Sequence, residues 1–269
     1  MTELGSRLLE TMPYALSRKH SLALCLAILS SCSAEEAPSV RVNVQAAGGP
    51  IAIVETDLGY RVTLTEARVA LGDITFTIAG EIHSASTSSR ILDWLVPAAY
   101  AHPGHYQGGE VTGELRGKLI VDFLAEAPTP IGVATMLVGA YTGSNVTLGH
   151  ADTLEDGDTL QNKTALLAGR AERNGVTHEF EAVIDSPVGR QVTGVPCSVT
   201  VAEGAAMTLT LRFTPYDDLE SDTLFDGIDF AALDSDGDGQ VSIMSGESAD
   251  AYDLLRRTFQ THDHFEFTP

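Results

Sequence analysis

Short runs in which apolar and polar residues alternate recur between residues 40 and 213, and they constrain the fold more than any other feature. A period of two buries one face of a β-strand and exposes the other, so each run predicts a strand. Glycine and proline interrupt the runs about every ten residues, and no long helical period lies between them. We therefore predict a mainly β fold, an antiparallel β-sandwich or barrel. The runs are 40–44, 60–65, 74–78, 119–123, 165–172, 176–184 and 207–213.

A turn signal separates two of these runs. Asn174-Gly175 stands between residues 165–172 and 176–184. A type I′ hairpin turn needs positive φ at both central residues, and Asn-Gly is the pair that adopts it most readily. The sequence therefore predicts a β-hairpin at this point.

The composition indicates a folded, acidic protein. Apolar residues make up 43% of the 269 positions and charged residues 20%, which is enough for a core and excludes wholesale disorder. The formal net charge is −21 at pH 7. Such acidity argues against nucleic acid as a partner, because phosphate binding requires clustered Lys and Arg. It favours cations as partners, or serves solubility alone.

The first 31 residues have the features of a secretory signal peptide. A basic stretch precedes an apolar run at residues 21–29, and small residues follow it. The run is too short to span a bilayer, which requires about 20 residues. We therefore predict that residues 1–31 are removed, with either Met1 or Met12 as the start of the signal.

The segment Leu29-Ser30-Ser31-Cys32 resembles the lipobox of bacterial lipoproteins. That resemblance implies that Cys32 becomes the lipid-modified first residue of the mature chain and anchors it to a membrane. Ser33 carries none of the acidic retention signal of inner-membrane lipoproteins, which implies an outer-membrane lipoprotein on the periplasmic or cell-surface side. The alternative is an ordinary signal cut near Ser33-Ala34, which leaves a soluble periplasmic protein.

The mature chain divides into three predicted segments. Residues 32–39 are a polar tether, residues 40–215 form the β-sandwich, and residues 216–269 form an EF-hand-like C-terminal unit packed on it. With Cys32 lipidated, Cys197 has no cysteine to pair with, so no intramolecular disulfide is expected. We interpret Cys197 as a small buried hydrophobic residue of a strand, and a soft metal ligand is the alternative.

An acidic loop near the C-terminus fits the first nine positions of an EF-hand-like calcium loop. Ca²⁺ takes six to eight oxygen ligands, and carboxylates at positions 1, 3 and 5 supply three of them. Gly239 at position 6 allows the sharp bend, and Val241 at position 8 is expected to pack inward. Position 12 is Ser245 instead of a bidentate Glu, so Glu247, or failing that Asp250, is expected to fold back into its place. The predicted Ca²⁺ ligands are Asp234, Asp236, Asp238, Gln240, Ser242 and Glu247.

Apolar residues at helical spacing flank this loop and predict a helix–loop–helix. The predicted helices cover residues 223–233 and 250–260. Without the usual final Glu, we expect the loop to stabilise structure at high calcium concentration rather than to sense cytosolic calcium. A solvated acidic turn without an ion is the alternative. The apolar faces consist of Leu224, Ile228 and Ala232, and of Tyr252, Leu255 and Phe259.

Two histidine pairs are candidates for a Zn²⁺ or Cu²⁺ site. Pro and Gly force a turn between His102 and His105, which brings the two imidazoles close together. In extended chain His262 and His264 would point to one face while Asp263 faces away. Four imidazole nitrogens, or three and a water, suit either metal. Separate minor sites and a purely structural hydrogen-bonding role are the alternatives. His150 is a weaker candidate, and we interpret His178 as a polar-face strand residue.

Several motifs together resemble a known group of proteins. Ala101-His-Pro-Gly-His-Tyr106, Gly109-Glu-Val-Thr-Gly-Glu114, Leu224-Phe-Asp-Gly-Ile-Asp-Phe230 and Thr261-His-Asp-His-Phe265 are similar to segments of uncharacterised secreted lipoproteins from myxobacteria-type bacteria. This resemblance implies no activity. More loosely, the chain is similar in class to periplasmic copper-handling proteins, but it lacks their Met-rich motifs.

Catalytic motifs are absent from the sequence. It contains no Gly-x-Ser-x-Gly elbow, no P-loop and no His-Glu-x-x-His helix, so a binding protein is favoured over an enzyme. We interpret the chain as an envelope lipoprotein that binds Ca²⁺, and Zn²⁺ or Cu²⁺, in metal handling or binding. One alternative is an envelope scaffold or adhesion module with only a stabilising Ca²⁺ site. A metal-dependent hydrolase, which needs an open coordination position and a general base, is less favoured.

Overall fold

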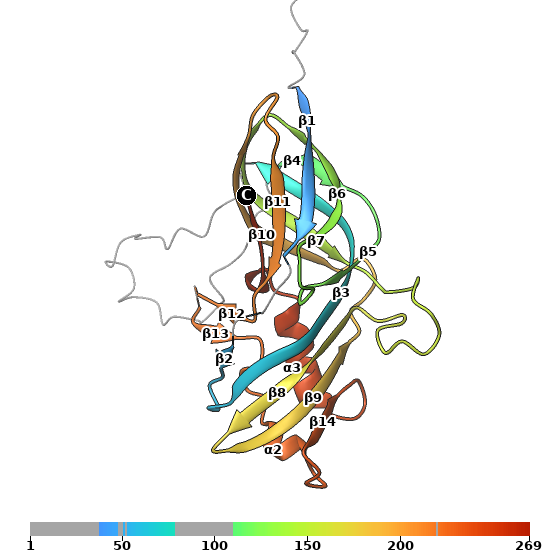
Figure 1. Cartoon of the computed structure of the whole chain (residues 1–269), viewed down its shortest axis with the longest axis vertical. Coiled ribbons are helices and arrows are strands. Elements are labelled where there is room, and N and C mark those ends of the chain that lie inside the picture. Colours follow the sequence, from blue (N-terminus) through green and yellow to red (C-terminus); the bar gives the residue numbers. More distant parts are fainter. Residues whose placement is uncertain (1–37, 48–50, 52, 79–109, 219) are drawn as a thin grey trace, which may run out of the picture. The chain divides into compact units, whose positions relative to one another are not determined.

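The computed structural model describes residues 38–47, 51, 53–78, 110–218 and 220–269 (Figure 1). Residues Pro38–Pro269 form one compact unit. Within the described residues, no helix has the length and apolar character that crossing a membrane requires. The strands are β1 (Ser39–Ala46), β2 (Val54–Glu55), β3 (Arg61–Ile78), β4 (Glu110–Leu115), β5 (Leu119–Asp122), β6 (Thr129–Leu137), β7 (Gly139–Leu148), β8 (Ala165–Arg173), β9 (Val176–Ile184), β10 (Gln191–Val201), β11 (Thr208–Phe213), β12 (Tyr216–Asp217), β13 (Asp222–Thr223), β14 (Gln240–Ile243) and β15 (Phe265–Thr268).

The mainly β fold predicted from the alternating runs is confirmed. Each run lies on one or more strands, and the burial of β10 and β9 alternates as the period of two requires. The predicted hairpin joins β8 to β9, with φ of 54° at Asn174 and 77° at Gly175. The sheet is mixed rather than wholly antiparallel, because β1 with β11, β10 with β15, and β9 with β14 are parallel pairs.

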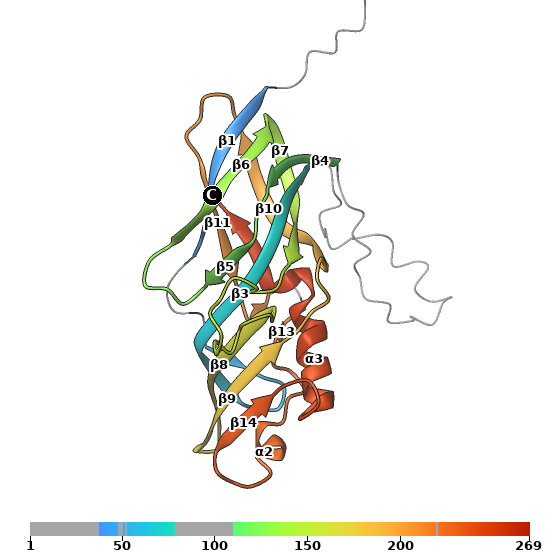
Figure 2. The ribbon, with the colours of Figure 1, turned by 90° about the vertical axis from the view of Figure 1, so that its right-hand side faces the viewer.

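The long strand β3 belongs to two parts of the sheet. Its second half pairs with β4 on one side and with β7 on the other. From β4 the order continues through β6, β1, β11, β15 and β10 to β7, so these strands close into a ring on β3. Figures 1 and 2 show β3 running from this ring down to β8 and β9. The first half of β3 therefore extends the sheet through β8 and β9 to β14.

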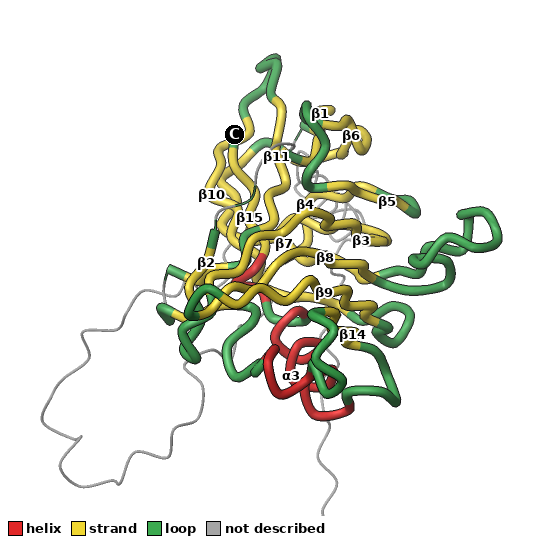
Figure 3. Tube along the Cα trace, turned by 60° about the horizontal axis from the view of Figure 1, so that its bottom comes forward, coloured by secondary structure: helices red, strands yellow, loops and turns green. Residues whose placement is uncertain are grey.

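The helices cover the part of the sheet that ends in β14. Helix α3 (Ala249–Phe259) contacts β9 and β14, and α2 (Phe230–Leu233) contacts β14 (Figure 3). Tyr252, Leu255 and Phe259 are the buried residues of α3, as its apolar spacing predicted. Phe230 is fully buried and its ring lies 5.2 Å from both Tyr60 and Phe180. These contacts hold α2 against β9 and against Tyr60, the residue before β3.

The predicted helix over residues 223–233 is wrong for most of its length. Thr223 ends β13, and only Phe230–Leu233 is α-helical. The side chain of Asp226 accepts hydrogen bonds from the backbone N and the hydroxyl of Thr223, which closes a tight turn instead of a helical one. Gly227 follows with φ of 77°, a conformation that ends any continuous helix. Leu224 and Ile228 are buried without a helix, whereas Ala232 is exposed.

The segment from residue 216 onward contributes two strands to the main sheet, while β12 and β13 form a separate hairpin. Its strand β14 pairs with β9, and β15 lies between β11 and β10 in the ring. The acidic loop, which lies between α2 and β14, is therefore held at both ends by elements that pack on the sheet.

Candidate metal centre

The acidic loop brings three carboxylates together. One oxygen each of Asp234, Asp236 and Asp238 lies within 4.8 Å of the other two. Gly237 and Gly239 have φ of 74° and 83°, which lets the chain turn tightly between these side chains. The spacing that predicted calcium-loop positions 1, 3, 5 and 6 therefore folds into a cluster of carboxylates.

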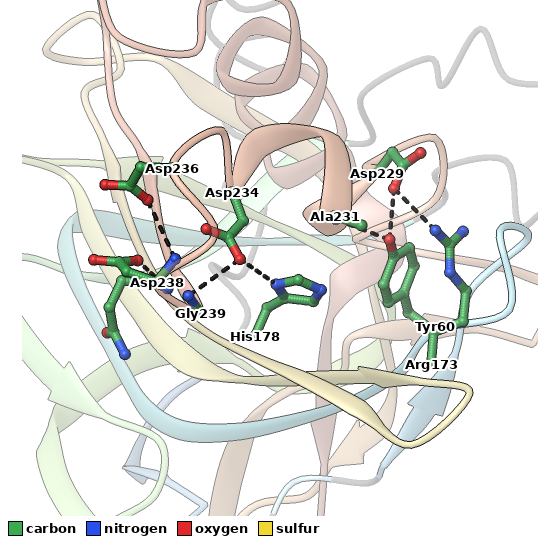
Figure 4. A network of polar contacts seen from close by, with 10 residues as sticks. Tyr60, Arg173, His178, Asp229, Ala231, Asp234, Asp236, Asp238 and Gly239 are labelled. Carbon is green, nitrogen blue, oxygen red and sulfur yellow. Dashed lines mark hydrogen bonds and ion pairs between the residues drawn. The ribbon is translucent and has the colours of Figure 1, made fainter.

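Asp234 is the buried member of this cluster. Its side chain is 7% exposed. Oδ2 accepts a hydrogen bond from the backbone N of Gly239 at 3.1 Å and lies 3.2 Å from Nδ1 of His178. Oδ1 is also buried, but it has no hydrogen-bond partner among the described residues. In Figure 4 this second oxygen points toward the side on which Asp236 and Asp238 lie.

A carboxylate oxygen buried without a partner is unfavourable, because it loses its hydrogen bonds to water and no hydrogen bond within the protein replaces them. A bound cation removes this cost, and the two neighbouring carboxylates supply further ligands and charge. The buried Oδ1 of Asp234, beside two further carboxylates, makes this loop a candidate cation site.

Asp236 and Asp238 are exposed and shape the turn through their own carboxylates. The backbone N of Gln240 donates to Asp238 Oδ1 at 2.8 Å, and the backbone N of Asp238 lies 3.4 Å from Asp236 Oδ1. Each contact spans two residues and uses one oxygen, so the other carboxylate oxygens can face an ion.

Glu247 lies beside the ninth position of the loop. The hydroxyl of Ser242 donates to Glu247 Oε2 at 3.0 Å, and the hydroxyl of Ser248 donates to the carbonyl of Ser242 at 3.2 Å. Both Ser242 and Glu247 are exposed. The chain beyond Ser245 thus brings Glu247 to Ser242, but Glu247 does not belong to the group formed by Asp234, Asp236 and Asp238, so its role as the replacement for the last ligand stays a prediction.

The end of the loop is attached to the sheet. Val241 is 3% exposed and pairs with Phe180 in the parallel β14–β9 ladder. The backbone N of Glu179 donates to the carbonyl of Gly239 at 2.8 Å. The inward-facing role expected of Val241 is confirmed, and Gln240 begins the same strand.

His178 contributes to the site although the sequence interpretation placed it on a polar strand face. It is 5% exposed, and its side chain contacts Asp234. The sequence alternation could have predicted this burial, because every second residue of a strand lies on the same face and His178 shares its face of β9 with Phe180 and Ala182. A histidine in such a position is buried and needs a polar partner, which Asp234 provides.

The two histidine pairs have different outcomes. His102 and His105 lie outside the described residues, so the site shared by both pairs stays a prediction. His262–His264 is a turn of 3₁₀-helix, not extended chain, and the expectation that Asp263 faces away from His262 is wrong. Asp263 forms an ion pair with His262. The reason is that the chain turns here between α3 and β15, which removes the extended geometry.

The two imidazoles lie in different environments. His264 is 1% exposed, and its Nδ1 donates to the carbonyl of Thr214 at 3.0 Å. Burial lowers the pKa of His264, whereas the hydrogen bond with Asp263 raises the pKa of His262. The pair is thus held by structural contacts that the sequence spacing did not reveal.

We expect the two imidazoles to titrate on opposite sides of the ordinary histidine pKa of 6.5. The carboxylate of Asp263 stabilises the charged form of His262, and burial opposes a charge on His264. A pH titration followed by NMR, with His262→Asn and His264→Asn used to assign the two signals, measures both pKa values. Equal values, or the reverse order, would contradict the described contacts.

A second group of carboxylates lies near this turn and was not predicted. The β12–β13 hairpin brings oxygens of Asp217, Glu220 and Asp222 within 4.8 Å of one another. Burial raises the pKa of Asp222, and the charges of Asp217 and Glu220 raise it further. The hairpin contacts the His262–His264 turn.

Of the predicted cysteine sites, one can be placed. Cys197 is fully buried in β10, which confirms its interpretation as a small hydrophobic residue of a strand. Burial raises the pKa of its thiol to about 12, so the thiol is neutral at physiological pH. Cys32, the predicted lipidation site, lies outside the described residues.

No protein family, curated protein or solved structure matches this chain. Its function is therefore inferred from the chemistry of its own residues.

Proposed function

We propose that this protein is an envelope lipoprotein that binds Ca²⁺ in the loop from Asp234 to Ser242. The observation that carries the proposal is the buried Oδ1 of Asp234, which has no partner among the described residues and points toward the side of Asp236 and Asp238. Lipid attachment at Cys32 and an outer-membrane location follow from the sequence and belong to the same proposal.

The chemistry of the loop favours Ca²⁺ over other ions. The candidate ligands are carboxylate, hydroxyl and carbonyl oxygens, which suit hard cations. Mg²⁺ demands near-ideal octahedral geometry, whereas Ca²⁺ accepts the irregular set that Asp234, Asp236, Asp238, Gln240, Ser242 and Glu247 offer. Because Ser245 replaces the bidentate Glu, we expect a Kd of about 10⁻⁴–10⁻³ M, as in extracellular calcium modules.

The proposed role of the ion is to stabilise the loop between α2 and β14. A Zn²⁺ or Cu²⁺ site at His102, His105, His262 and His264 stays a prediction from sequence, and so does a part in metal handling. The scaffold or adhesion alternative shares the Ca²⁺ site and differs in having no Zn²⁺ or Cu²⁺ site and no part in metal handling. For a hydrolase, no observation among the described residues adds support.

Calcium titration of the purified protein tests the proposal. About 10 mM Ca²⁺ is 10 to 100 times the expected Kd, which corresponds to a stabilisation of about 1.4–2.7 kcal/mol. For a domain of this size the Tm should rise by about 3–10 °C. Isothermal calorimetry should give one site, and KCl of equal ionic strength serves as the control. Equal effects of CaCl₂ and KCl would refute Ca²⁺ binding.

A further inference from the structure

Tyr60 joins the end of the β2–β3 turn to the beginning of α2. Its hydroxyl donates to Asp229 Oδ1 at 2.5 Å and accepts a hydrogen bond from the backbone N of Ala231 at 2.9 Å. The tyrosine is fully buried, and Figure 4 shows both bonds converging on its hydroxyl oxygen. One phenol therefore fixes two points of the first turn of α2.

Arg173 of β8 completes this arrangement. Its guanidinium lies 4.1 Å from the centroid of the Tyr60 ring, and Nη2 lies 3.3 Å from Asp229 Oδ1. The hydrogen bond from Tyr60 lowers the pKa of Asp229, which keeps its carboxylate charged at neutral pH. We name Tyr60, Asp229 and Arg173 the tyrosine latch.

Helix α2 needs such support. It has only four residues, and a single turn is too short to be stable by itself. Asp229 occupies its N-cap position, but the side chain makes no capping hydrogen bond. The latch provides the fixed contact at this end that a cap would otherwise give.

The other end of α2 leads directly into the candidate site. Asp234 is its C-cap residue, and the backbone N of Asp234 donates to the carbonyl of Phe230 at 3.1 Å. The carboxylate of Asp234 is held by His178 and by the backbone N of Gly239, neither of which belongs to α2. The latch and the first calcium ligand thus lie at opposite ends of one short helical turn, as Figure 4 shows.

We propose that the tyrosine latch positions Asp234 for Ca²⁺ and thereby sets the calcium affinity of the loop. This inference rests on the proposed function. A ligand held in place before the ion arrives loses less conformational freedom on binding, so affinity is higher. Tyr60 acts through α2 and does not itself touch the ion, which makes it a positioning residue.

Tyr60→Phe tests the latch without changing charge or removing the buried ring. The substitution removes both hydrogen bonds of the hydroxyl, and only the part of their free energy that depends on bound calcium changes the affinity, so we expect the calcium Kd to rise about fivefold. The decisive readout is the rise in Tm caused by calcium, measured on each variant. A latch that only stabilises the fold would lower the Tm of the calcium-free and calcium-bound forms equally and leave this rise unchanged.

Tyr141→Phe is the matched control. Tyr141 is also buried, and its hydroxyl bonds to the carbonyls of Thr112 and Leu137, but it lies in β7, in the ring of strands away from α2 in Figure 1. We expect this variant to lose stability with an unchanged calcium Kd. Asp229→Asn provides a second probe should Tyr60→Phe not fold, with Asp253→Asn on the exposed side of α3 as its charge-matched control.

The possible outcomes separate the two proposals. A larger Kd in Tyr60→Phe or Asp229→Asn, with both controls like the wild type, supports the latch. Unchanged calcium affinity in the latch variants, with normal binding by the wild type, overturns the latch and leaves the calcium site intact. Absence of calcium binding in the wild type overturns both.

Discussion

Replacing Asp234 by Asn is expected to remove measurable calcium binding while leaving the calcium-free protein folded. Asp234 is the buried carboxylate of the proposed site, and it carries the charge that a desolvated cation needs. Loss of one charged contact of this kind costs about 3 kcal/mol, or about 100-fold in Kd. From a starting Kd near 10⁻³ M, the affinity falls below the range of calorimetry.

The same substitution should not harm the calcium-free protein. An Asn oxygen can still accept from the backbone N of Gly239 and from His178, so the contacts of Oδ2 persist. The amide NH2 then takes the buried position of Oδ1 and faces the side of Asp236 and Asp238, where it can donate to their carboxylates in the empty loop. We expect the free energy of unfolding without calcium to stay within about 1 kcal/mol of the wild type, or to increase.

Urea unfolding with and without calcium measures both effects. Asp253→Asn removes an equal charge from the exposed side of α3, and it should retain the calcium-dependent increase in stability. If Asp234→Asn binds calcium like the wild type, the ion does not occupy this loop. If it unfolds without calcium, the carboxylate of Asp234 is required for the fold itself, which contradicts the expected stability of the calcium-free variant.

The loop could be predicted from sequence because its information is local. Apart from Glu247, the proposed ligand positions lie within nine residues, and the glycines that permit the turn stand between them. The Asn174-Gly175 turn was predictable for the same reason. Alternation also located the strands, since burial on one face of a sheet imposes a period of two on any strand.

The remaining features depend on contacts between distant residues. Closure of the ring requires β3 to pair with both β4 and β7, and alternation within a strand does not specify its partners. Leu224 and Ile228 have helical spacing, but they lie in a turn that the side chain of Asp226 closes, and this turn buries both of them without a helix. The latch joins Tyr60 to Asp229, 169 residues apart, and no local pattern marks either of them.

Gly169→Ala is expected to destabilise the protein more than most single substitutions on the sheet. A Cβ at Gly169 would lie 2.3 Å from the carbonyl oxygen of Thr63 and 3.0 Å from the Cα of Leu64. Both are backbone atoms, so only a separation of β3 from β8 can relieve the clash. The register between these strands also shifts between Leu64 and Glu66, so the backbone opposite Gly169 is already irregular and cannot easily move further. We expect a loss of about 3 kcal/mol and a fall in Tm of about 6–12 °C.

Gly72→Ala is the matched control on the other part of β3. Its Cβ would meet side-chain atoms of Thr147 at 3.4 Å, an ordinary contact, so a change below about 1 kcal/mol is expected. Thermal unfolding followed by circular dichroism compares the two variants. Because β8 carries β9, and β9 holds both His178 and β14, the calcium affinity of Gly169→Ala should fall as well. Similar Tm values for both variants would show that β3 and β8 do not approach each other this closely at Gly169. A lower Tm with unchanged calcium affinity would show that the loop does not depend on their pairing.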